Sequence, residues 1–148
     1  LCLLEFVDRR MMATQMKTLQ QRYGCSIVPG TTPVLTEAEN QLVAYFAGSL
    51  REFDLPLDYR GTEFQVAVWR RLLDIPFGQT LSYSAMANDL GRPDAQRAVG
   101  KANGDNRIAI IVPCHRVVKA DGTLCGYGGG LWRKKRLLDL EQGQLSLV

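Results

Sequence analysis

A cysteine and a histidine stand next to each other at Cys114 and His115, and His115 is the single histidine among the 148 residues. A thiol is a strong nucleophile only as the thiolate, and a free cysteine is little ionised at neutral pH. It therefore needs a base or a positive charge beside it, and an imidazole can supply that base. The pair predicts an activated nucleophilic cysteine. The alternative is a small core residue beside a structural histidine.

The residues before the pair indicate how it is held. The apolar run 108–112 is typical of a buried strand. Pro113 ends that strand because proline has no N–H to donate to a ladder of hydrogen bonds. We therefore expect a reactive thiol at the end of a rigid element, aimed by a forced turn.

Composition narrows the class of protein. No apolar run approaches the roughly 18 residues that a membrane-spanning helix needs, and no signal peptide is recognisable, so we expect a cytoplasmic protein without membrane contact. The cysteines have neither CxxC nor zinc-finger spacing: Cys2, Cys25, Cys114 and Cys125. We expect free thiols, no disulfide and no metal site.

Charge is unevenly distributed along the chain. Residues 1–60 contain six Lys and Arg against seven Asp and Glu, whereas residues 61–148 contain twelve against eight. A basic second half suits a polyanionic partner such as DNA.

The first sixty residues predict a small α/β unit. We expect strands at 3–7, 25–28 and 53–57 and helices at 12–23 and 36–47, the second helix opening at a capping box from Thr36 to Glu39. The unit contains no catalytic constellation, and we interpret it as a scaffold for the second half. Because the chain begins inside a predicted strand, we expect this sheet to be incomplete.

The second part, residues 61–148, predicts a mostly helical domain with helices at 62–73, 82–90, 94–103 and 131–140. The first of these helices opens at a capping box from Thr62 to Gln65. The two middle helices, joined by a glycine-containing turn, are typical of a helix-turn-helix. The second of them is rich in Ala and Gly, which lets a helix enter the narrow minor groove of DNA.

Asn106, the apolar run after it and residues 113–118 together resemble the active-site signature of the O6-alkylguanine-DNA alkyltransferases, and the match extends over about residues 61–146. The resemblance implies direct-reversal DNA repair. The alkyl group of O6-alkylguanine would pass to the Cys114 thiolate in a single turnover, after the nucleotide is flipped out through the minor groove, and no cofactor takes part. The implied fold is a ribonuclease-H-like N-terminal unit followed by a winged-helix-like DNA-binding domain.

The resemblance also implies roles for individual residues. Glu141, twenty-seven positions after Cys114, would orient His115 as the base, and Tyr83 would donate toward N3 of the departing guanine. Arg97 would fill the gap that the flipped nucleotide leaves. The other implied residues bind substrate, at Tyr127, Gly128, Val117 and Asn106, or bind DNA, at Ala95, Gln96, Arg92 and Lys101.

The implied partner is double-stranded DNA carrying O6-alkylguanine, with O4-alkylthymine as a further substrate to test, and we expect a monomer associated with a bacterial nucleoid. Three alternatives stay open. The chain could be the catalytic half of a bifunctional alkylation sensor and transcription activator. It could be a non-catalytic lesion-binding relative, against which the presence of Cys114 argues. It could also be a cysteine hydrolase, which would turn over.

Overall fold

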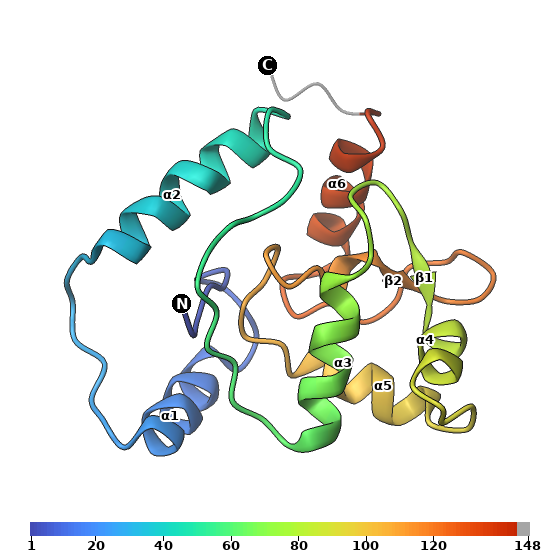
Figure 1. Ribbon diagram of the computed structural model, residues 1–148, viewed down its shortest axis with the longest axis horizontal. Coiled ribbons are helices and arrows are strands. Elements are labelled where there is room, and N and C mark those ends of the chain that lie inside the picture. The colour runs from blue at the N-terminus through green and yellow to red at the C-terminus, as the bar shows by residue number, and fades with distance from the viewer. Residues whose placement is uncertain (145–148) are drawn as a thin grey trace.

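The computed structural model describes residues 1–144, which form a mostly helical protein with one small sheet (Figure 1). Helices α1 and α2 lie along one side, α4 and α5 along the other, and α3 and α6 lie between them. No helix in this part of the chain is long and apolar enough to cross a membrane. The elements in chain order are α1 (Met12–Tyr23), α2 (Pro33–Phe46), α3 (Glu63–Leu73), β1 (Leu81–Ser82), α4 (Tyr83–Asp89), α5 (Gln96–Gly104), the 3-10 helix η1 (Cys114–Arg116), β2 (Val117–Val118) and α6 (Leu131–Glu141).

Helix α3 anchors the second half of the chain. Its capping box forms as predicted: the Thr62 hydroxyl accepts from the Gln65 N–H, and the Gln65 side chain accepts from the Thr62 N–H. Trp69 is buried and donates from its indole nitrogen to the carbonyl of Ala102 at 2.8 Å, which joins α3 to α5. Residue 61 must be glycine here, because a Cβ atom would lie 2.7 Å from the Trp69 ring.

The predicted pair of helices after α3 is present. Ser82 caps α4 by accepting from the Ala85 N–H at 3.0 Å, and Gly91 turns the chain after α4 with a φ of 68°. Helix α5 begins at Gln96, two residues later than expected, and packs against both α3 and α4. β1, just before α4, pairs in parallel with β2, which follows η1, so the pairing fixes the helix pair relative to Cys114.

The expected N-terminal sheet does not form. The strand predicted at 3–7 is reduced to a bridge between Leu4 and Ile108, and residues 25–28 and 53–57 are not strands. Side chains in 53–59 do alternate between inward and outward, as in a strand. The pairing of this segment with residue 1 stops at two hydrogen bonds, from the Leu1 nitrogen to the Pro56 carbonyl at 2.6 Å and from the Asp58 N–H to the Leu1 carbonyl at 2.9 Å. Local alternation cannot reveal whether a partner strand exists.

Helix α2 begins earlier than predicted. Thr32 is its N-cap and accepts from the Leu35 N–H at 3.2 Å, and Pro33 occupies the first helical position, where proline is favoured. The expected start at the Thr36–Glu39 capping box is therefore wrong. The Thr32-Pro33 pair and the Thr36–Glu39 box are both local signals for the start of a helix. The helix begins at the one that lies further upstream.

The buried strand predicted at 108–112 is also absent, and this segment makes a series of tight turns. Ile110 has a φ of 69°, and Ile111 donates to the Ala109 carbonyl at 2.8 Å across it. A left-handed isoleucine is strained and persists only where its surroundings hold it. An apolar run signals burial, which is correct here, but not the backbone conformation.

Candidate active site

Cys114 begins the short helix η1 directly after a turn at Pro113. Pro113 has φ −83° and ψ 63°, and the Cys114 N–H donates to the Val112 carbonyl at 2.8 Å, which is an inverse γ-turn. The expected forced turn is therefore present, although it follows other turns and not a strand. Cys114 is 7% exposed and lines a small hollow.

A cluster of buried donors surrounds the Glu141 carboxylate at the end of α6. His115 Nε2 lies 2.7 Å from Glu141 Oε1. Arg116 donates from Nε and Nη2 to the two carboxylate oxygens, both at 2.9 Å. The Tyr45 hydroxyl donates at 2.7 Å, and the Gly78 N–H at 3.1 Å. Burial alone would raise the pKa of Glu141, but the hydrogen bonds from His115 and Arg116 outweigh it and lower that pKa to about 2.

Burial and the contact with Glu141 together set the protonation state of His115. Burial lowers the pKa of the imidazole, and this effect outweighs the opposing contribution of Glu141. The ring is therefore neutral near pH 7, with its proton on Nε2 facing Glu141. Nδ1 is buried and has no hydrogen-bond partner among the described residues. A neutral histidine with a free Nδ1 lone pair is able to accept a proton.

The pKa of the Cys114 thiol is raised by burial, and the nearby Glu5 carboxylate raises it further. The Asn106 amide and the cations of Lys134 and Arg9 oppose that change. The sulfur is therefore mainly protonated near pH 7, and a base has to take its proton before it can act as a nucleophile.

Two asparagines hold the backbone around the thiol. The Asn106 amide donates to the Val112 carbonyl at 2.9 Å and accepts from the Ile108 N–H at 3.0 Å. The Asn103 amide, from α5, donates to the Cys114 carbonyl at 3.2 Å. These bonds satisfy buried backbone groups that no sheet or helix pairs, and they fix the thiol to the end of α5.

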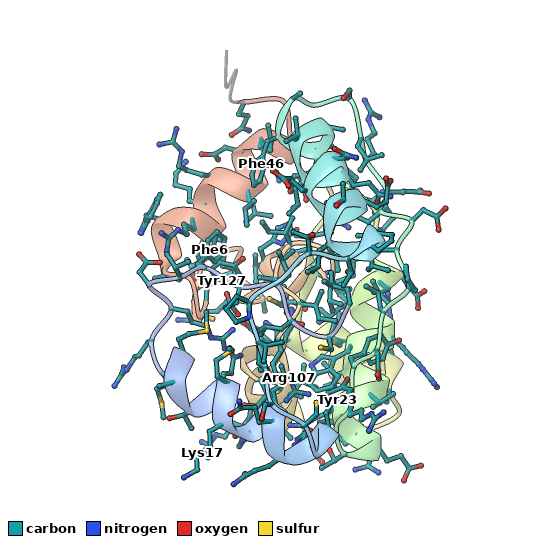
Figure 2. All side chains as sticks on the ribbon, turned by 90° about the vertical axis from the view of Figure 1, so that its left-hand side faces the viewer. Phe6, Lys17, Tyr23, Phe46, Arg107 and Tyr127 are labelled. Atoms are coloured by element: carbon teal, nitrogen blue, oxygen red, sulfur yellow. The ribbon has the colours of Figure 1, made fainter. Side chains whose placement is uncertain are left out.

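The hollow beside Cys114 has a volume of about 10 Å³, room for roughly one water molecule. Gly126, Tyr127 and Gly128 form one wall of it, and Glu5 and Arg9 contribute from the N-terminal segment. Tyr127 lies beside Phe6, with ring centroids 6.3 Å apart (Figure 2). The Tyr127 hydroxyl is buried without a hydrogen-bond partner among the described residues, so it is a free polar group in the wall.

Tyr83 and Val117 lie near the hollow without lining it. The Tyr83 hydroxyl donates a long hydrogen bond, 3.4 Å, to the Cys125 carbonyl, and burial raises the pKa of that hydroxyl. Val117 is fully buried, and its carbonyl accepts from Lys134 Nζ at 2.6 Å. Lys134 also donates to the Cys125 carbonyl at 2.9 Å, so this ammonium joins β2 to the loop that precedes Tyr127.

Comparisons with known proteins show which family the chain belongs to. Residues 63–143 match the family described as the 6-O-methylguanine DNA methyltransferase, DNA binding domain. The chain is 53% identical over 133 residues to the methylated-DNA–protein-cysteine methyltransferase of Mycobacterium bovis, covering 88% of this chain and 81% of that protein. The chain belongs to the 6-O-methylguanine DNA methyltransferase family.

Solved structures of family members share the fold. The crystal structure of Mycobacterium tuberculosis OGT in complex with DNA has a TM-score of 0.82 and 47% identity, covering 99% of this chain and 83% of that one. The O6-methylguanine-DNA methyltransferase of Pyrococcus kodakaraensis has a TM-score of 0.69 and 30% identity, covering 87% and 76%. The alternative of a sensor and transcription activator receives no support from these relatives, which are named as methyltransferases.

The family match includes the residues expected to contact DNA, and these lie on and before α5. Arg92, Gln96, Arg97 and Lys101 are exposed, and Ala95 is half-buried. The Arg92 guanidinium stacks over the Phe64 ring at 5.3 Å, and Lys101 pairs with Asp105 at 3.0 Å. The α5 surface is thus available to a partner, while its inner face holds Cys114 through Asn103.

Several residues at this candidate site were not predicted from the sequence. Arg116 and Tyr45 bind Glu141, and Glu5 and Arg9 line the hollow. The N-terminal unit therefore contributes Glu5, Arg9 and Tyr45 to the site, beside the scaffold role predicted from the sequence. Arg116 had a local signal, since it follows His115 directly. The other three are distant in sequence, and only a buried polar residue within an apolar pattern could have suggested them.

Proposed function

We propose that this protein repairs O6-alkylguanine in duplex DNA by direct reversal, transferring the alkyl group to Cys114. The observation that carries the proposal is that Cys114 lines a hollow and is followed directly in the chain by His115, whose Nε2 lies 2.7 Å from Glu141. Nucleophile, base and orienting carboxylate follow the logic of a catalytic triad. Together with the family membership, this favours alkyl transfer over a hydrolase, and no cofactor is needed.

The reaction begins with a proton transfer. His115 Nδ1 takes the proton of the Cys114 thiol through a water molecule, and Glu141 stabilises the imidazolium that forms. The thiolate attacks the alkyl carbon in line with its bond to O6. The C–O bond breaks, and guanine leaves with the electron pair. A thioether forms on Cys114, and because thiols cannot reduce it, each protein acts once.

The base must leave the stacked duplex before the thiolate can reach it, which costs a few kcal/mol. In our proposal Tyr83 donates a hydrogen bond or proton to N3 as guanine departs, and the Gly128 backbone N–H donates to O6. Tyr127 lies against the base. Val117 and Asn106 complete the binding site, the first as a wall and the second by holding the Cys114 segment in place.

DNA binds through the minor groove against α5. Arg97 occupies the space of the flipped nucleotide, Ala95 and the small residues of α5 allow the helix to approach the groove floor, and the Gln96 side chain contacts the DNA beside them. Arg92 and Lys101 contact phosphates, so affinity falls as salt concentration rises. The exposure of these long side chains on one surface supports this assignment.

We further propose that the chain divides near residues 60 and 61 and acts as a monomer. The family match over 63–143 supports the boundary. A turn in which the backbone N–H of Lys119 donates to the Thr123 carbonyl supports a winged-helix-like second domain. The ribonuclease-H-like form of the first unit stays a prediction, because of its expected strands only the bridge from Leu4 to Ile108 forms.

Mass spectrometry tests the function directly. Incubation with duplex DNA containing labelled O6-methylguanine should add one methyl group per protein, at Cys114. Cys114→Ala should take up no label and still bind DNA, whereas Cys25→Ala, which removes an exposed thiol, should be labelled like the parent. Repeated turnover, or labelling of Cys114→Ala, would contradict the proposal.

A further inference from the structure

The Arg9 guanidinium lies over the hollow that Cys114 lines. It pairs with the Glu5 carboxylate and donates to the carbonyls of Asn106 at 3.0 Å and Gly104 at 2.7 Å. The side chains of Arg9 and Glu5 are 12% and 1% exposed. A Cβ atom on Gly128 would lie 2.7 Å from the guanidinium carbon, so Arg9 packs closely against the loop that contains Gly126 and Gly128.

The hollow has to open before any base can enter. Its volume of about 10 Å³ is far too small for a purine. The wall formed by Asn103, Asn106 and Ala109 is buried and hydrogen-bonded. Arg9 reaches from the N-terminal segment across to the carbonyls of Gly104 and Asn106, and it is held there by side-chain contacts alone. A change of rotamer moves its long side chain without moving the backbone.

A larger groove adjoins the hollow, and Arg9 lines both. The groove has a volume of about 500 Å³ and is lined by residues of α1 and α5. Arg107, which also lines it, lies close to α1 (Figure 2). Its lining includes the cations Arg10, Arg22, Lys101 and Arg107 against a single acidic residue, Asp105. A groove of this charge next to the helix that faces DNA suits a phosphate of the DNA backbone.

We propose that Arg9 is a specificity-determining residue that makes access to Cys114 depend on DNA. In the free protein it closes the hollow, and when a nucleotide enters it moves into the groove and pairs with a backbone phosphate. Departure leaves the buried Glu5 carboxylate without its ion-pair partner, which is costly, so the closed state is favoured until a phosphate provides a new ion pair. A free base brings no phosphate and is therefore selected against. This inference rests on the proposed function only for the identity of the base.

The closed state is tested without DNA or substrate. Iodoacetamide alkylates exposed thiols, and peptide mass spectrometry follows Cys114 separately, with the exposed Cys25 as internal reference. Arg9→Ala should raise the alkylation rate of Cys114 by roughly tenfold, the factor expected from the net loss of about two hydrogen bonds. Removing this cation also disfavours the Cys114 thiolate, so electrostatics alone would slow the reaction. Faster alkylation of Cys114 would therefore show that its thiol has become more accessible.

Two further variants complete this test. The double variant Glu5→Gln with Arg9→Ala leaves no unpaired carboxylate, so it protects the fold. It should be alkylated at least as fast as Arg9→Ala, because losing the Glu5 carboxylate also lowers the pKa of the Cys114 thiol. Arg10→Ala, which removes an exposed neighbouring cation that lines only the groove, should leave the Cys114 rate unchanged. If Arg9→Ala and the double variant both unfold at the parental temperature and neither is alkylated faster, Arg9 does not close the hollow.

Substrate assays test the selectivity. Arg9→Ala should react faster than the parent with O6-benzylguanine as a free base, and the slope of its duplex affinity against salt should fall by about one phosphate contact. Slower reaction with the free base would overturn the selectivity. If no variant accepts an alkyl group at all, the proposed function fails, whereas the iodoacetamide result still decides whether Arg9 closes the hollow.

Discussion

Tyr45 on α2 donates a 2.7 Å hydrogen bond to the same Glu141 oxygen that lies 2.7 Å from His115. Both side chains are buried, and Tyr45 lies 96 positions before Glu141 in the chain. The N-terminal unit thus helps to orient the carboxylate that holds the base. Burial raises the pKa of the Tyr45 hydroxyl, and the charge of Glu141 raises it further. This hydroxyl therefore stays protonated and remains a donor.

Tyr45→Phe should test this link. The hydroxyl is lost from a charged acceptor, so we expect the free energy of unfolding to fall by about 1.5–3 kcal/mol and the rate of methyl transfer to fall several-fold. Urea unfolding and single-turnover kinetics measure the two effects. Tyr23→Phe is the matched control, because its hydroxyl bonds to the Asp58 carbonyl on the surface. A parental transfer rate in Tyr45→Phe would show that Tyr45 only supports the fold.

Glu141→Gln should have a larger effect on the reaction. The amide removes the charge that stabilises the imidazolium and leaves Arg116 buried without its counter-ion. We expect the free energy of unfolding to fall by about 3–5 kcal/mol, and methyl transfer to slow by roughly a hundredfold or more at saturating DNA. Duplex affinity, measured by fluorescence anisotropy, should stay near the parental value. A variant that stays folded and transfers methyl at the parental rate would exclude Glu141 from the mechanism.

Stability should depend on pH through His115. Its folded pKa lies below the ordinary value of 6.5, so below that pH the unfolded chain binds a proton that the folded protein does not. The free energy of unfolding should therefore be constant above pH 6.5 and fall below it, by up to about 1.4 kcal/mol per pH unit. Glu141 adds a second loss as the pH drops below its ordinary value of 4.5 toward about 2, because its folded pKa is lowered.

Urea unfolding between about pH 5 and 7.5 measures the first of these losses. His115 is the single histidine, so no other side chain of ordinary pKa titrates in this interval. In His115→Gln the decline between pH 6.5 and 5 should disappear. A parental protein whose free energy of unfolding stays level down to pH 5 would show that the buried imidazole is not held neutral.

Arg97→Ala should separate nucleotide flipping from chemistry. Arg97 is exposed on α5, away from the Glu141 cluster, so its loss should leave the thiol and its base intact. We expect repair of duplex DNA to weaken markedly and reaction with a free-base substrate to change much less. Arg92→Ala, a cation at the start of the same surface, should lower duplex affinity without this difference. Equal losses of Arg97→Ala on both substrates would remove its role in flipping.

The features predicted correctly from the sequence are local ones. The capping box of Thr62 and Gln65 and the turn at Pro113 each depend on residues a few positions apart, and side-chain chemistry at that range determines the backbone. Burial of 108–112 was predicted correctly because the run is apolar, which is also a local property of the sequence. Its conformation was not, because Asn106, the Leu4 bridge and the Ile110 turn together satisfy the backbone groups that a strand would have paired.

The sequence by itself determined that one cysteine and one histidine are neighbours, and which family that pair belongs to, because a joint motif needs no coordinates. Only the tertiary structure decided what surrounds them. Glu141 receives Arg116 and Tyr45 as well as His115, and Arg9 lies over Cys114. These groups come from helices and loops far apart in the chain. Their contacts follow from how α2, α6 and the N-terminal segment pack, and no spacing along the chain encodes that packing.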